Sequence, residues 1–137
     1  MEIWAVIFWV LTVTGGLFML GITLRAGKDG VTSNLPPSVV MLHATLGVVG
    51  LGLYALALGY NEESLTWTAL GAALLAAGGG TFMFLRWLKD HHGSPEEVEA
   101  NEARLAEQQI PSTVVHMHGA FAGLTIVAVL LVALGIG

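Results

Sequence analysis

Four stretches of the sequence contain no Asp, Glu, Lys or Arg, and each is long enough to cross a lipid bilayer. They cover residues 3–24, 39–60, 65–85 and 112–136. Crossing about 30 Å of hydrocarbon takes roughly 20 helical residues at about 1.5 Å each. None of the stretches alternates apolar and polar residues as a barrel strand does. The sequence therefore predicts an all-α integral membrane protein, a four-transmembrane-helix bundle that forms one membrane domain over residues 1–137.

Composition excludes several classes of protein. Hydrophobic residues make up 55% of the 137 residues and charged residues only 11%, whereas about a quarter of a soluble domain is charged. The net charge of −5, without a basic patch, argues against binding to nucleic acid. Because cysteine is absent, disulfides, thiolate metal sites and cysteine nucleophiles are excluded. No catalytic motif is present, so an electron-transfer or binding protein is favoured over a stand-alone enzyme.

The positive charges indicate how the helices are oriented. All five Lys and Arg residues follow the first or the third stretch: Arg25, Lys28, Arg86, Lys89 and Arg104. Under the positive-inside rule these two connections are cytoplasmic and both termini lie outside. We therefore expect a multi-pass protein of a bacterial inner membrane whose first stretch is a retained helix and not a cleaved signal peptide.

The connection before the last stretch has the sequence pattern of a short cytoplasmic helix. Ser94-Pro95-Glu96-Glu97 combines an N-cap, a proline at the first helical position and a capping-box glutamate. The pattern predicts a helix that runs to about Gln109, before Pro111. Its polar, acidic face fits a solvated spacer or a docking surface for a soluble partner.

The two halves of the chain, residues 1–60 and 61–137, resemble each other. Residues 15–19 (GGLFM) match residues 79–83 (GGTFM) at an offset of 64, and Pro37-Ser38 matches Pro111-Ser112 at an offset of 74. At an offset of 75, His43 corresponds to His118. The pattern predicts a tandem two-helix repeat whose halves are related by a pseudo-two-fold axis along the membrane normal.

His43 and His118 are expected at the same depth in the membrane. They lie six residues after Pro37 and seven after Pro111, which places each roughly 9–10 Å along its helix. An imidazole in hydrocarbon needs a hydrogen-bond partner or a metal. Two imidazoles from facing helices are the ligand set of a bis-histidine haem b. One haem between the second and fourth membrane helices is the leading hypothesis.

Neighbouring residues fit a flat macrocycle. Gly47 and Ala122 each follow a histidine by four positions, so they share its helix face and are small. Close helix pairs use the same small residues without a cofactor. Arg25, Arg86 and Lys89 are expected near the same membrane surface, where they would pair with the haem propionates; the same cations also serve as topology signals.

The other histidines and the methionines leave alternatives open. His116 lies two residues before His118, about 200° around the helix, and is the fallback ligand. His91 and His92 are expected in solvent. A copper site is the alternative metal centre, because thioether and imidazole groups occur at one level. Its candidate ligands are Met41, His43, His116, Met117 and His118.

In architecture the chain resembles small bacterial transmembrane b-type cytochromes. The resemblance rests on His43 in LHATLG (42–47) and His118 in HGAFAG (118–123), within four spans. Such proteins usually carry two stacked haems and four histidines, whereas this chain has one intramembrane histidine pair. The resemblance implies one-electron transfer or haem handling near the cytoplasmic leaflet, with a quinone, a redox partner protein or a homodimer to complete the path. The contrasting hypothesis is a cofactor-free structural or accessory subunit.

Overall fold

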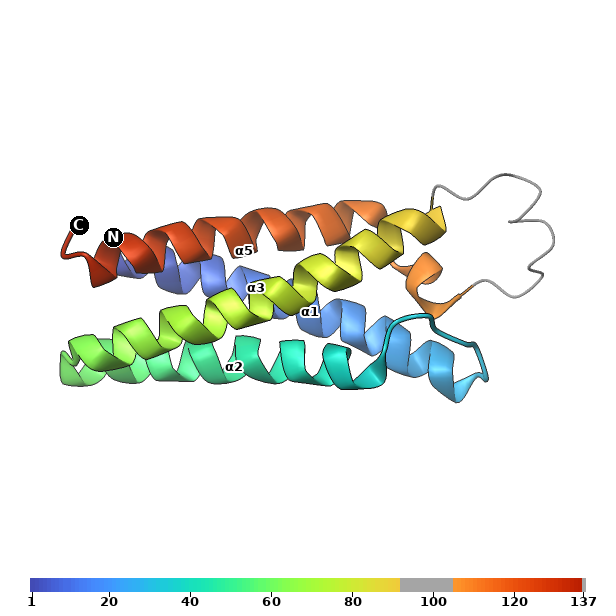
Figure 1. The fold of residues 1–137 in the computed structure, drawn as a ribbon, viewed down its shortest axis with the longest axis horizontal. Helices are drawn as coiled ribbons and strands as arrows, with labels where there is room; N and C mark the ends of the chain where they lie inside the picture. The colour runs from blue at the N-terminus through green and yellow to red at the C-terminus, as the bar shows by residue number, and fades with distance from the viewer. Residues whose placement is uncertain (92–104, 137) are drawn as a thin grey trace.

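The computed structural model describes residues 1–91 and 105–136, and within these ranges the chain is helical with no strand. It consists of α1 (Glu2–Lys28), α2 (Pro37–Tyr60), α3 (Glu63–His91), the short 3-10 helix η1 (Ala106–Gln109) and α5 (Ser112–Ala133). The four α-helices are long and apolar enough to cross a membrane. The prediction of a multi-pass four-helix membrane bundle is therefore confirmed (Figure 1).

The helices differ in length from the uncharged stretches. α1 and α3 run four and six residues past the expected ends at 24 and 85, through their basic residues. Backbone groups hydrogen-bond within a helix whether it lies in hydrocarbon or at the headgroups, so charge does not mark the end of a helix. α5 instead ends at Ala133, three residues before the stretch does, because Gly135 has a positive φ of 69°.

Proline and left-handed residues set the other boundaries. Pro36 and Pro111 precede α2 and α5 with extended ψ values of 123° and 128°, and a proline at such a position removes an N–H that a helix start would leave unpaired. α2 ends at Tyr60, and the next residue, Asn61, has a φ of 55° that reverses the chain towards α3. Asparagine tolerates this left-handed conformation better than most residues.

The four long helices form a ring in which α2 packs most extensively on α3, and α1 on α5, with smaller contacts between α1 and α2 and between α3 and α5. α2 and α5 therefore lie on one diagonal. Both termini and the α2–α3 turn lie at one end of the bundle, and the two longer connections lie at the other (Figure 1). We call the two halves of the bundle the terminal half and the connection half.

The expected helix from Ser94 to Gln109 lies mostly outside the described residues. Its last part does not continue a helix, because Leu105 has an extended ψ of 152° and only Ala106–Gln109 form a 3-10 turn. This segment is buried and not solvated: Glu107 is 0% exposed. Glu107 accepts a hydrogen bond of 2.7 Å from the Asn34 N–H, and Ala106 donates one to the Thr32 carbonyl. The segment thus ties the two connections together.

The packed core lies in the terminal half. The Trp9 ring stacks on the Tyr54 ring with centroids 5.8 Å apart, and Tyr54 is fully buried. Gly50 makes room for the indole, since a Cβ at this position would lie 2.7 Å from Trp9 Cζ2. The buried cluster consists of Ala5, Trp9, Tyr54, Ala69, Leu70, Ala73, Ala128 and Val129.

Candidate functional site

The structure brings together the two histidines that the sequence analysis singled out. His43 on α2 and His118 on α5 have ring centroids 5.9 Å apart, with the ring planes inclined by 66°. They come from the two helices on the diagonal of the ring. Both imidazoles therefore meet in the middle of the bundle, in its connection half.

Each imidazole is held in one tautomer by a backbone carbonyl. His43 Nδ1 lies 2.8 Å from the Ala76 oxygen, and His118 Nδ1 lies 2.9 Å from the Thr12 oxygen. A carbonyl oxygen only accepts, so Nδ1 must donate its proton in both cases. The lone pair is then on Nε2, for which the described residues provide no hydrogen-bond partner. This is the arrangement in which a histidine binds a metal through Nε2.

Two glycines make these hydrogen bonds accessible. A helical side chain covers the turn before it, so a side chain at position 16 or 80 would cover the carbonyl four residues earlier. A Cβ on Gly80 would lie 3.0 Å from His43 Cε1, and a Cβ on Gly16 would lie 3.1 Å from His118 Cε1. Because each contact is tighter than ordinary van der Waals packing, glycine at both positions lets the imidazole lie against the neighbouring helix.

The histidine pair lines a cavity of about 590 Å³ between the helices. This volume lies within the range of roughly 300–1,000 Å³ that holds drug-sized ligands and cofactors. The walls are mainly apolar, with few polar groups. The polar residues among them are Thr12, Thr23, Thr81, Thr125, His43, His116 and His118, together with the indoles of Trp9 and Trp87.

The histidine pair fits a bis-histidine haem in spacing and chemistry. Two imidazoles that bind one metal ion from opposite sides, each at about 2 Å, have ring centroids roughly 6 Å apart. The observed separation is 5.9 Å. Ala122 and Gly47, the small residues four positions after the histidines, also line the cavity, so no large side chain on that face obstructs a flat ring.

His116 is separated from the pair. Its Nδ1 lies 2.7 Å from the Ser112 carbonyl of its own helix, and its ring lies edge-on to Phe84 and Trp87, with centroids 5.9 and 5.8 Å away. It lines the cavity but has no contact with His43 comparable to that of His118. α3 ends at His91, whose side chain, like all of His92, lies outside the description.

The predicted propionate partners do not line the cavity. Arg25, Arg86 and Lys89 are all exposed and lie near the connection end of α1 and α3. Arg86 donates a 3.0 Å hydrogen bond to the Asn34 carbonyl and lies over the Phe82 ring. The Asn34 backbone thus accepts a hydrogen bond from Arg86 at its carbonyl oxygen and donates one from its N–H to the Glu107 carboxylate.

The copper ligand set is not assembled. Met41 and Met117 are 53% and 49% exposed, and neither lines the cavity. Within residues 1–91 and 105–136 no group of three or more His, Asp or Glu side chains is arranged to hold a metal ion. A bis-histidine haem needs only two protein ligands, so that finding does not bear on it.

Sequence reasoning missed several parts of the site. Gly16 and Gly80 marked the repeat, but their role beneath the histidines depends on which helices become neighbours. The carbonyls of Thr12 and Ala76 carry no side-chain signal at all. Trp9 donates its indole N–H to the Gly47 carbonyl at 3.0 Å and lines the cavity, a role that a tryptophan in an apolar stretch does not reveal.

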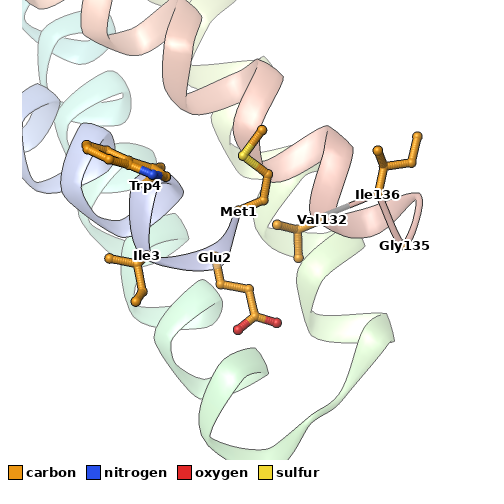
Figure 2. A pocket seen from close by; sticks show the side chains of 7 residues that line it. All are labelled: Met1, Glu2, Ile3, Trp4, Val132, Gly135 and Ile136. Atoms are coloured by element: carbon orange, nitrogen blue, oxygen red, sulfur yellow. The ribbon is translucent and has the colours of Figure 1, made fainter.

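A second hollow, of about 540 Å³, lies at the chain termini. Its seven lining residues come from Met1 and the first turn of α1, and from the end of α5 and the residues after it (Figure 2). Glu2, Ile3 and Trp4 point in different directions, and Glu2 has the one charged side chain in the lining. Without converging polar groups this surface is not a candidate site.

Comparisons with known proteins give no match: no family model, no curated protein and no solved structure is similar to this chain. Functional reasoning therefore rests on the geometry of the histidine pair.

Proposed function

We propose that this protein binds one haem b between α2 and α5 through Nε2 of His43 and His118. The observation that carries the proposal is the pair of imidazoles 5.9 Å apart, each with Nδ1 committed to a backbone carbonyl. Two independent helices thus present ligand nitrogens of the same tautomer to one cavity. A pair of histidines that only packed together would not need the same carbonyl-and-glycine arrangement twice.

When bound, haem b supplies a one-electron ferric–ferrous couple. The chain's own residues fix the two imidazoles, exclude water through the apolar cavity walls and keep the neighbouring helices close enough to hold both sides of a flat ring. The proposed role is one-electron transfer or haem handling near the cytoplasmic leaflet of a bacterial inner membrane, with both termini outside. The electron donor or acceptor is a quinone or a redox partner protein.

A tandem duplication of a two-helix unit is part of the proposal. The offset of 64 that relates the two glycine pairs also relates Thr12 to Ala76, the two residues whose carbonyls hold the histidines. The offset of 75 relates the histidines themselves. The same pattern of contacts in both halves supports an ancestral pair of identical sites around one haem.

The test is an absorption spectrum of protein purified in detergent after expression with ample haem. We expect a Soret band and sharp reduced α and β bands in the wild type, and their loss in both His43→Ala and His118→Ala. His116→Ala is the matched control on the same helix and should retain the bands. A colourless wild-type protein would contradict the proposal, as would loss of the bands only in His116→Ala.

The second candidate function is a cofactor-free accessory subunit of a membrane complex. It is favoured by one observation: each histidine already has a hydrogen-bond partner in its Nδ1–carbonyl contact. A colourless wild-type protein with an intact fold supports this candidate. Metal analysis of the same sample separates both functions from the copper alternative.

A further inference from the structure

The cavity wall reaches the surface of the bundle on two sides. On the α1–α2 side, Leu17 and Val48 line the cavity and are 51% and 48% exposed. On the α3–α5 side, Thr81, Gly119 and Gly123 line it and are exposed as well. The closely packed pairs α1–α5 and α2–α3 close the two remaining sides.

The two open sides consist of equivalent positions with different residues. The offset of 64 relates Leu17 to Thr81, and the offset of 75 relates Val48 to Gly123. On the α1–α2 side both side chains are branched and aliphatic. On the α3–α5 side the equivalent residues are Thr81, which is small and polar, and Gly123, which has no side chain. A Cβ at Gly123 would meet nothing within 4 Å. At the level of Thr81 and Gly123 the α3–α5 side therefore carries less side-chain bulk than the α1–α2 side, while closer to the connections the His116 ring on α5 contacts Phe84 and Trp87 on α3.

The ends of the cavity are closed. Towards the termini, Trp9 stacks on Tyr54 and bonds to the Gly47 carbonyl. Towards the connections, Leu35 and Ile110 line the cavity, and the buried segment 105–110 is tied to residues 32–34 by two hydrogen bonds. A large ligand cannot enter along the bundle axis without unfolding one of these ends.

The hydroxyl of Thr81 distinguishes the α3–α5 side further. Thr12, Thr23 and Thr125 also line the cavity, and each donates to the carbonyl four residues earlier in its own helix. Thr81 makes no such bond among the described residues. Its hydroxyl is free to donate to an acceptor on a ligand, and in hydrocarbon a free hydroxyl is costly unless it has such a partner.

We propose that haem b enters and leaves the cavity sideways, from the lipid phase, through the gap between α3 and α5 that Thr81, Gly119 and Gly123 line. This inference rests on the proposed haem function and specifies it: the protein exchanges haem with the membrane. Haem is flat and largely apolar, so the bilayer is a favourable source and sink for it. The Thr81 hydroxyl donates to a carboxylate of the macrocycle as it passes.

The test is the rate at which haem-loaded protein in lipid nanodiscs transfers haem to excess apomyoglobin, followed in the Soret region. The double variant T81L/G123V copies the α1–α2 side and closes the proposed gap. We expect its transfer rate to fall by about tenfold or more, because added side chains in a tight gap raise the barrier to passage. Both iron ligands, His43 and His118, are retained, and the Soret band of the loaded variant shows that haem is bound before transfer is started.

The matched variant is L17T/V48G, which opens the α1–α2 side. Combined with T81L/G123V, it should restore transfer through the new gap. If T81L/G123V fails to fold, Gly119→Ala, which copies Ala44 at the equivalent position, gives a milder obstruction and should slow transfer less. A closed variant with an intact spectrum that transfers haem at the wild-type rate overturns the lateral route alone. A wild-type protein without a Soret band overturns the haem function and the route with it.

Discussion

The terminal half and the connection half of the bundle are packed differently. In the terminal half, small residues and two stacked aromatic rings form a buried cluster in which Tyr54 and Val129 are fully covered. In the connection half, the same four helices enclose a cavity of about 590 Å³ around two histidines. Trp9 lies at the boundary and belongs to both, since it joins the cluster and donates to Gly47 in the cavity wall.

The difference indicates which half stabilises the fold and which half has room for a ligand. Between transmembrane helices there is little hydrophobic driving force, so association depends on close packing and interhelical hydrogen bonds. A cavity forfeits those contacts along its walls. The terminal half is therefore expected to contribute more to the stability of the bundle than the connection half, whose cavity walls lack those contacts.

Tyr54→Ala should produce the largest loss of stability. Removing a buried aromatic side chain costs about 3–5 kcal/mol in well-packed cores, and Tyr54 is fully buried against Trp9. Reversible unfolding in mixed micelles measures it. Tyr54→Phe is the control: the hydroxyl is buried without a hydrogen-bond partner in the described part of the chain, so its removal should cost nothing. A large loss in Tyr54→Phe would show that the hydroxyl has a partner.

Bound haem should protect backbone amides of the connection half from hydrogen exchange, but not those of the terminal half. Some backbone amides exchange their hydrogen only when the site opens. At a free haem concentration 100 times the Kd, the exchange of these amides should slow by up to about a hundredfold. We expect this in residues 12–23, 37–48, 76–87 and 112–122, which surround the cavity, and little change in the terminal half. Exchange measured by mass spectrometry tests it. Uniform protection along all four helices would contradict the division into two halves.

Two glycines one turn apart on α2 allow the packing of the terminal half to be compared with that of the connection half. A Cβ on Gly50 would lie 2.7 Å from Trp9, whereas a Cβ on Gly47 would have nothing within 4 Å. Overpacking typically costs about 1–3 kcal/mol, so Gly50→Ala should destabilise the protein by that amount. Gly47→Ala should be neutral or slightly stabilising, because alanine favours a helix by up to about 1 kcal/mol over glycine. Equal effects of the two changes in the same unfolding assay would argue against a packed and an open half.

Trp9→Phe should have a small effect. It keeps an aromatic ring against Tyr54 but removes the 3.0 Å hydrogen bond to the Gly47 carbonyl, which is worth about 1 kcal/mol. Because that bond joins the two halves, exchange should increase near Gly47 and not near Val129. An unchanged exchange pattern would mean that the halves are not linked through Trp9.

The fold was largely predictable because the membrane leaves few choices. Uncharged stretches of this length must be helical, and Pro37 and Pro111 set two of the helix starts. The ends at the headgroups were less predictable, since α3 continues through Arg86 to His91. The burial of Glu107 was not foreseen, because a charged residue in a connection gives no sign of the Asn34 N–H that it meets.

The histidine pair was predictable from matching positions in the two halves of the sequence, and its surroundings were not. Matching positions placed His43 and His118 at one depth, but nothing in the sequence showed that the rings would lie against Gly80 and Gly16 on other helices. Exposure of a side chain depends on which face of a helix meets its neighbours. For that reason Met41 and Met117 could be proposed as copper ligands from the sequence and still lie on the outer surface.

The most direct test of the central claim is the electron paramagnetic resonance spectrum of the oxidised, haem-loaded protein and of its His43→Gly and His118→Gly variants. If both imidazoles bind one iron, the wild type gives a low-spin ferric signal. Each variant then gives a high-spin signal that added imidazole converts back to low spin. A wild-type protein that is already high-spin, or a variant that stays low-spin without imidazole, would contradict ligation by this pair.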